Sequence, residues 1–348
     1  MAEIVFGFGT SHGPLLATPP EEWDLRGAVD RRNPELAWGD ATYTFDELAR
    51  ARGPQFAPAN APEVRDERSA RCQAALDALG REYASAGADA LLIIGDDHHE
   101  WFMADIQPAF SLFHGASVLN RALTPEEEQR QIANGVGYAM KIYYPPRDEI
   151  YACPADLATH MVKHAIADGF DVTACGQQPA DAGLARRLGH SFGFIYRRIL
   201  GDLRPPLIPV MVNTYYPPNQ PSPRRCFEFG RALGRAIKAW PGAQRIAVAA
   251  SGGLTHFVVD EDMDRRLLAA MAARDHDTLT GEPDIHFRSG TSEIKNWIVL
   301  AGLLAETNLS MRLLDYVPCY RTEAGTGSGM GFAIWRSNAL DVSPSELT

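Results

Sequence analysis

Four histidines, His12, His98, His190 and His256, stand where apolar stretches of the sequence end or turns begin. A neutral imidazole binds metal ions, and an uncoordinated one can transfer protons near neutral pH. Two imidazoles and one carboxylate on one face of an iron(II) ion leave open positions for a substrate and for dioxygen. A lone histidine of this kind is more often hydrogen-bonded scaffolding, but histidines at the ends of several parallel strands converge on one crevice. The pattern therefore favours a shared metal site.

A carboxylate for such a site stands at Glu293, in the stretch SGTSEIKNWIVLAGLL. Glu293 shares a helical stripe with Trp297 and Leu300, on what is otherwise the apolar side of a buried helix. A buried carboxylate requires a partner, and a metal ion is a suitable one. We therefore expect Glu293 to complete the ligand set.

The acidic residues Asp96 and Asp97 precede His98 directly. Adjacent residues bind one ion together only with difficulty, so we expect the two aspartates to orient the imidazole by hydrogen bonds. His99 follows His98, and a shift of one residue in strand register would exchange the two histidines. His98 is the expected ligand, and His99 is the alternative.

The candidate residues follow short apolar segments that read as buried strands. Segments with helical periodicity separate these strands, at about 66–85, 155–170 and 224–240. Strands that alternate with helices predict an α/β fold, with a mostly parallel central sheet flanked by helices. The apolar segments are EIVFGF before His12, ALLIIG before Asp96, LIPVMVN at 207–213 and RIAVAAS at 245–251.

Residues 1–348 are expected to form a single α/β catalytic domain. Two connections, at about 17–65 and 120–152, are longer than an α/β sheet requires. Long connections in a compact domain are usually functional or mobile, so we expect these two insertions around the active-site cleft.

The composition excludes several classes of protein. A formal net charge of −11 and the absence of a basic run argue against nucleic acid as a partner. Without a signal peptide or an apolar run of about 18 residues, we expect a cytoplasmic protein with no membrane partner. Five widely spaced cysteines without a CxxC pair suggest neither a disulfide framework nor a thiolate zinc site. Neither GxGxxG nor GxxxxGK occurs, so a nucleotide cofactor has no support.

Five sequence blocks occur in a specific order: GTSHGPLL, GDDHHEWF, LIPVMVNTYYPPN with RRCFEFGRALGRAI, SGGLTH, and GTSEIKNW. In this order the chain resembles the class III extradiol ring-cleavage dioxygenases, from residue 3 to about residue 305. Members include the catalytic subunit of protocatechuate 4,5-dioxygenase and the gallate and 3-O-methylgallate dioxygenases. The resemblance implies non-haem Fe(II) as cofactor and O2 as co-substrate. It also implies cleavage of an aromatic ring next to, not between, two adjacent hydroxyls.

The resemblance assigns roles to individual residues. The iron ligands of the family match His12, His98 and Glu293, and the acid/base histidine matches His256. A second pocket histidine of the family, which binds substrate or stabilises charge beside it, resembles His190.

The chain departs from the family pattern at two of these positions. Thr255 replaces the serine before the acid/base histidine, and Gly189 replaces the aspartate that usually precedes the second pocket histidine.

Asn213, Tyr215 and Tyr216, just after a core strand, are candidate substrate-binding residues, or else part of a structural turn made by Pro217 and Pro218. The substrate implied is a small aromatic diol, carboxylated or methoxylated, such as 3-O-methylgallate, gallate or protocatechuate. A homo-oligomer, in the simplest case a dimer, is the expected assembly.

Two other functions use the same residues. A zinc hydrolase could bind its ion with two histidines and a glutamate plus water, although no HExxH motif is present. A non-catalytic binding protein on the same scaffold is the third reading, since a fold does not guarantee a function.

Overall fold

The computed structural model describes residues 1–132, 136–179 and 187–337. The described residues form a mixed nine-stranded sheet in the order β11-β13-β1-β10-β4-β9-β5-β8, with β12 beside β13. Its strands are β1 (Glu3–Thr10), β4 (Ala90–Asp96), β5 (Phe110–Phe113), β8 (Thr173–Cys175), β9 (Leu207–Val212), β10 (Arg245–Ser251), β11 (His256–Val258), β12 (Ser310–Tyr320) and β13 (Thr326–Arg336).

The centre of the sheet is parallel. β1, β10, β4 and β9 lie side by side in this order and run in the same direction. Antiparallel pairs flank this centre, because β13 pairs with β1, β11 and β12, and β5 pairs with β9, while the edge strand β8 is parallel to β5. The predicted α/β fold with a parallel central sheet is confirmed. The hairpin β12–β13 closes one side of it, and the three-residue strand β11 is too short for the sequence pattern to reveal.

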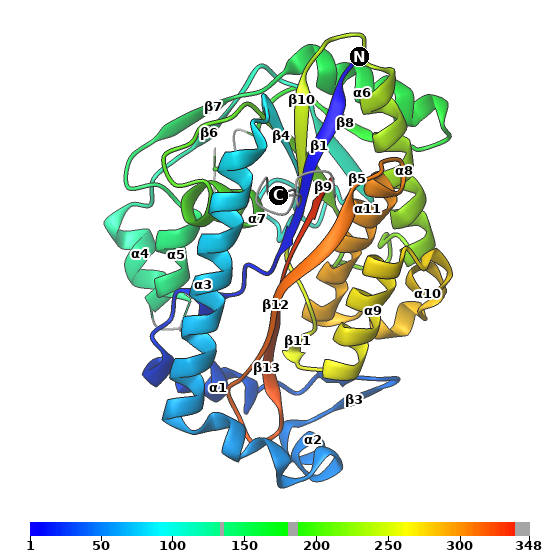
Figure 1. Cartoon of the computed structure of the whole chain (residues 1–348). Helices are drawn as coiled ribbons and strands as arrows, with labels where there is room; N and C mark the ends of the chain where they lie inside the picture. The colour runs from blue at the N-terminus through cyan, green and yellow to red at the C-terminus, as the bar shows by residue number, and fades with distance from the viewer. Residues whose placement is uncertain (133–135, 180–186, 338–348) are drawn as a thin grey trace, which may run out of the picture.

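Helices cover both faces of the sheet (Figure 1). β4 illustrates the arrangement, since Leu92 and Ile94 join the core on one face, while Leu91 and Ile93 join the core on the other. The first core includes residues of α6 (Ala155–Ala167), α8 (Pro223–Ala239), α9 (Glu261–Ala273) and α11 (Ile294–Ala305), and the second includes residues of α3 (Pro62–Ala86), α5 (Gly137–Tyr143) and α7 (His190–Phe194).

The two long connections contain secondary structure of their own. Segment 17–65 holds α1 (Asp24–Asp30), the hairpin of β2 (Leu36–Trp38) and β3 (Ala41–Tyr43), and α2 (Phe45–Arg52). Segment 120–152 holds α4 (Pro125–Ile132), α5 and β7 (Glu149–Ala152), and β7 pairs with β6 (Ser117–Asn120). Residues 133–135 of this segment, and residues 338–348 of the predicted domain, lie outside the described residues.

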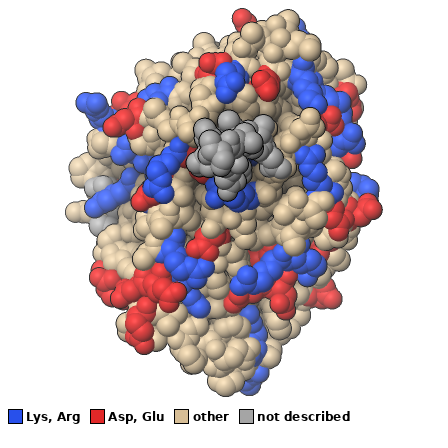
Figure 2. All heavy atoms as spheres, viewed as in Figure 1, with Lys and Arg blue, Asp and Glu red and all other residues tan. Residues whose placement is uncertain are grey.

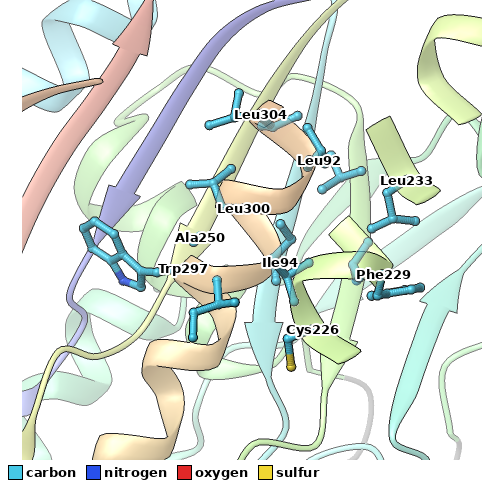
Figure 3. Close-up of a cluster of buried hydrophobic side chains, with 14 of the residues drawn as sticks. Leu92, Ile94, Cys226, Phe229, Leu233, Ala250, Trp297, Leu300 and Leu304 are labelled. Carbon is cyan, nitrogen blue, oxygen red and sulfur yellow. The ribbon is translucent and has the colours of Figure 1, made fainter. Parts of the chain in front are cut away.

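Helix α11 packs against the sheet and against α8 (Figure 3). Trp297, Leu300 and Leu304 of α11 lie in one core with Leu92 and Ile94 of the sheet. This helix follows a 3₁₀ turn at Ser289–Glu293, so Glu293 stands at the entrance of α11 rather than within it. The core that anchors α11 therefore also fixes the position of Glu293.

None of the helices in the described ranges is long and apolar enough to cross a membrane. Figure 2 shows arginine and lysine interspersed with aspartate and glutamate on the viewed face, rather than one continuous basic surface.

The close packing of α8 on α11 gives the first prediction. A Cβ at Gly230 of α8 would overlap the carbonyl oxygen of Val299 in α11, and backbone cannot move aside cheaply. Gly230→Ala should therefore lower the free energy of unfolding by about 1–3 kcal/mol, as measured by urea denaturation. Gly281→Ala is the matched control, because a Cβ there meets nothing within 4 Å. Equal stability of the two variants would contradict this packing.

Candidate active site

Three of the four predicted histidines follow neighbouring parallel strands. His12 comes two residues after β1, His98 two residues after β4, and His256 follows β10 through a glycine turn. Because β1, β10 and β4 are adjacent and parallel, their carboxyl ends bring these side chains to one edge of the sheet. His190, the first residue of α7, joins them, with its Nε2 3.2 Å from Nε2 of His12.

The carboxylate of Glu293 lies at the centre of this cluster. Its Oε2 is 3.4 Å from His12 Nε2, and its Oε1 is 3.7 Å from His98 Nε2 and 3.2 Å from His256 Nε2. Glu293 is 2% exposed, so water does not solvate its charge. Burial raises the pKa of Glu293, but His256 and His12 lower it, to about 2. The group is therefore a buried anion surrounded by imidazole nitrogens.

Hydrogen bonds fix which nitrogen of His12 faces Glu293. The Ser251 hydroxyl donates to the carbonyl of Ser191 at 2.6 Å, so its oxygen accepts from His12 Nδ1 at 3.0 Å. A neutral His12 then presents the lone pair of Nε2 to the carboxylate of Glu293. Two acceptors that face each other repel, and a cation between them turns this arrangement into a favourable one.

Two buried polar atoms of the cluster, Asp96 Oδ2 and His98 Nε2, contact each other at 2.8 Å but make no regular hydrogen bond within the described residues. Unpaired buried polar atoms are costly unless something else binds them. Two groups of candidate metal-binding atoms are close enough to share an ion, one of His12, Asp96 and His190, the other of Asp96, His98 and Glu293. The residues present therefore fit a metal ion.

The aspartates differ from the sequence-based expectation. Asp96 is nearly fully buried and brings an oxygen into the candidate ligand set itself, rather than serving only as a hydrogen-bond acceptor. Asp97 does not orient His98, because its carboxylate accepts from the backbone N–H groups of Trp101 and Phe102. Its carboxylate instead holds the turn after β4 in place.

His256 is held by two kinds of contact. Its Nδ1 donates to the carbonyl of Leu254 at 2.8 Å, so Nε2 faces Glu293. The preceding residue, Thr255, donates its backbone N–H and its hydroxyl to the buried carboxylate of Asp264, at 2.9 and 2.8 Å. A threonine hydroxyl can make the same bond as the serine of the family pattern, so this substitution leaves the anchoring intact.

Sequence reasoning missed Glu100, a buried carboxylate that binds His190 twice. It accepts from His190 Nδ1 at 2.9 Å and from the His190 backbone N–H at 2.8 Å. A Cβ at Gly189 would lie 2.9 Å from Glu100 Oε2, so the glycine leaves room for this carboxylate. In the family pattern an aspartate precedes the second pocket histidine. Here Gly189 stands at that position, and Glu100 supplies a carboxylate to His190 instead. The only signal in the sequence was its place in the block GDDHHEWF.

The other predicted residues lie around the cluster rather than in it. His99 stacks on Tyr216, with ring centroids 3.8 Å apart, and contacts Gln107, so the structure brings His98 and not His99 to Glu293. Asn213, predicted as a pocket wall, instead closes a turn, because its side chain exchanges two hydrogen bonds with the backbone of Tyr216. Tyr215 faces His98, with ring centroids 5.4 Å apart.

A cavity of about 380 Å³ opens beside the cluster. Its lining includes His12, His98, His190, His256 and Glu293, which is why a small ligand could reach all of them. Segments from both long connections complete the wall: Arg26 from α1, and Val136, Met140 and Tyr143 from the region of α5. A second cavity of about 600 Å³ adjoins it and shares Arg26 and Phe257.

Comparison with known proteins identifies the family of the chain. Residues 53–325 match the family described as the catalytic LigB subunit of aromatic ring-opening dioxygenase. A gallate dioxygenase of Pseudomonas putida is 26% identical over 170 residues, 43% of this chain and 46% of that protein.

Two relatives are named 2,3-dihydroxyphenylpropionate/2,3-dihydroxicinnamic acid 1,2-dioxygenase. The one from Azotobacter vinelandii is 29% identical over 103 residues, 30% of either chain. The one from Mycobacterium sp. is 27% identical over 180 residues, 51% of this chain and 47% of that protein. The matches thus span less than half the length of each of the three relatives.

The family match extends over most of the chain and includes four of the five residues of the cluster, namely His98, His190, His256 and Glu293, while His12 precedes it. The chain therefore belongs to the LigB family of catalytic subunits of aromatic ring-opening dioxygenases.

Proposed function

We propose that the protein is a non-haem Fe(II)-dependent extradiol dioxygenase that opens the ring of a carboxylated catechol, using O2. One observation carries the proposal: several imidazole nitrogens converge on one buried carboxylate beside a cavity large enough for a small aromatic ring. Family membership supports the reaction class. It makes ring opening a better reading than zinc-dependent hydrolysis or binding without catalysis.

The ion would be held by His12, His98 and Glu293, one carboxylate and two imidazoles, which is the donor set that iron(II) oxygenases use. When bound, iron(II) would supply the redox chemistry that allows O2 to react with the aromatic diol. The buried oxygen of Asp96, 2.8 Å from His98 Nε2, would stabilise the positive charge of the site.

His256 is proposed as the proton-transfer group. Its Nδ1–H is bound to the carbonyl of Leu254, so Nε2 is the atom that can take a proton from a substrate hydroxyl in the cavity. The bond between Thr255 and Asp264 holds the residue before it, which limits the motion of the imidazole. His256 can then return the proton to an oxygen of the opening ring.

His190 is proposed to hydrogen-bond the substrate. Glu100 accepts from its Nδ1–H, so its Nε2 points towards His12 and the cavity. The carboxylate thereby fixes the orientation of the ring and keeps Nδ1 protonated. Burial lowers the pKa of His190, but Glu100 raises it to about 10, so Nε2 carries a proton that can be donated to a substrate oxygen beside the ion.

The relatives support a carboxylated substrate. Their names refer to gallate and to dihydroxyphenylpropionate or dihydroxycinnamate, each an aromatic compound with hydroxyls and a carboxylate. We further propose that residues 1–348 act as one catalytic domain, in which segments 17–65 and 120–152 form part of the cavity wall. Arg26 and Tyr143 come from these segments and line the cavity.

Oxygen uptake tests the proposed function. Protein loaded anaerobically with Fe(II) should consume O2 with at least one of protocatechuate, gallate and 3-O-methylgallate, and should form a yellow ring-opened product. Zn(II)-loaded protein is the control and should consume none, because zinc has no redox chemistry. Uptake with none of these substrates, despite one iron bound per chain, would contradict the proposal.

Substitutions at the cluster should separate metal binding from catalysis. Glu293→Ala should lose bound iron, because it removes the carboxylate of the ligand set. His256→Ala should keep its iron, while kcat falls on the order of 100-fold or more, because the proton acceptor is gone. Iron content by metal analysis and kcat by oxygen uptake measure the two effects.

His164→Ala serves as the control for these substitutions, since this histidine lies on α6, outside the cavity lining. It should match the unmodified protein in both measurements. Equal iron loss in His256→Ala and Glu293→Ala would contradict the proposal that Glu293 binds the metal while His256 transfers protons.

Glu100→Gln should lower kcat by about tenfold to a hundredfold without loss of iron. An amide has one oxygen, so it can accept only one of the two hydrogen bonds from His190. Its NH2 group would also favour the wrong tautomer at Nδ1. Glu100→Asp should recover part of the activity, because it restores both acceptors.

Glu82→Gln is the matched control, because Glu82 bonds Arg312 and Arg336 away from the cavity. Its kcat should equal that of the unmodified enzyme. Full activity of Glu100→Gln would remove Glu100 from the mechanism.

A further inference from the structure

Arg26 of α1 brings a positive charge to the cavity of the histidine cluster. It lines that cavity together with Arg321, and it also lines the adjoining larger cavity with Arg32 and Arg288. Arg26 therefore lies where the two cavities meet. Its side chain is partly buried, so its charge is incompletely solvated.

The packing of α1 fixes this placement. A Cβ at Gly27 would lie 3.0 Å from the carbonyl oxygen of Arg321, so the helix contacts the chain that follows β12 directly. Asp30 lies four residues after Arg26, on the same face of the helix. Its two carboxylate oxygens accept from Nε and Nη2 of Arg321 at 2.6 and 2.9 Å, and one of them also accepts from Thr326.

Arg321 is bound to Asp30 through a two-pronged hydrogen bond, and Arg26, which lines both cavities, lies next to this pair. Burial lowers the pKa of Arg26, and the like charge of Arg321 lowers it further. An anion bound by Arg26 would offset both effects, because it would replace lost solvation and neutralise part of the repulsion.

The kind of charged group changes from one end of the cavity to the other. The strongest electrostatic influences on Glu293 come from Asp96, His256 and His12, whereas those on Arg26 come from Arg321, Asp30 and Tyr143. Tyr143 connects the surroundings of Glu293 with those of Arg26. Its hydroxyl donates to the carbonyl of His12 at 2.7 Å, and it interacts electrostatically with both Glu293 and Arg26. One end of the cavity is therefore lined by Glu293 and the histidines, and the other end by Arg26 and Arg321.

An aromatic diol with a carboxylate matches this arrangement of charges. Its hydroxyls suit the histidines and the ion, while its carboxylate would be repelled by Glu293, Glu100 and Asp96. A guanidinium can bind a carboxylate through two parallel hydrogen bonds. We propose that Arg26 binds the carboxylate of the aromatic substrate and thereby selects carboxylated diols over plain catechol. This inference rests on the proposed function and names the residue that reads the substrate.

Binding measured without oxygen tests the inference. Fe(II)-loaded protein is titrated anaerobically with protocatechuate and with catechol in a calorimeter, and the ratio of the two Kd values is compared between variants. The unmodified protein should bind protocatechuate at least about tenfold more tightly than catechol. Arg26→Gln should weaken protocatechuate binding by about tenfold to a hundredfold and leave catechol binding unchanged, since catechol has no carboxylate for the guanidinium to bind.

Two further variants complete the test. Arg26→Lys should fall between the unmodified protein and Arg26→Gln, because a lysine keeps the charge but not the planar pair of donors. Arg32→Gln makes the same change of charge in the outer cavity only and should leave the Kd ratio unchanged.

Each other result has a definite meaning. Equal weakening of both ligands in Arg26→Gln would show that Arg26 supports the fold of the cavity, which overturns the inference. An unmodified protein that opens the ring of catechol and protocatechuate but binds them equally would overturn the inference and leave the proposed function intact. An unmodified protein that binds neither diol would overturn the proposed function, and the inference with it.

Discussion

The buried carboxylate of Glu293 is the constraint on which the rest of the site depends. An anion that is 2% exposed is stable only if cations or donors surround it, and a positive ion held between Glu293 and the imidazoles of His12, His98 and His256 would meet this need. The backbone N–H of Gly253 adds a hydrogen bond at 2.9 Å. The parallel strands, the packing of α11 and the glycine turn after β10 all serve to hold these few atoms together.

Glycines make the close approach possible. Gly252 has a φ of 119°, and a Cβ there would lie 2.7 Å from Oε2 of Glu293. A Cβ at Gly9 of β1 would lie 2.5 Å from the ring of Trp297, and this ring donates from Nε1 to the carbonyl of Gly252 at 2.8 Å. The indole thus connects the first strand, the turn and the helix of Glu293. Larger side chains at these glycines would push the carboxylate away from the histidines.

The sequence predicted most of this arrangement because its signals are local. Apolar strands and periodic helices identify the α/β sheet, and polar residues at strand ends identify His12, His98 and His256. Glu100 escaped prediction because its partner, His190, is 90 residues away in the chain. Adjacency to His98 suggested a supporting role for Asp96, and it did not reveal that an oxygen of Asp96 also lies close enough to His98 and Glu293 to share an ion with them. The side chain of Asn213 went to the backbone of its own turn, an outcome that a motif cannot distinguish from a pocket wall.

The cavity divides its chemistry between two kinds of chain segment. The histidines and Glu293 come from the ends of sheet strands and from the entrance of α11, which the core holds rigidly. Arg26 comes from a long connection and is only partly buried, so substitutions there disturb the core less, whereas Tyr143 of the other long connection belongs to the second core. Under the proposed roles, the strand ends carry the reaction and the connections read the substrate, so family membership informs more on the reaction than on the substrate. Some relatives will have the same histidines and glutamate but a different segment around α1. We expect these relatives to catalyse the same ring opening on aromatic diols that carry other substituents.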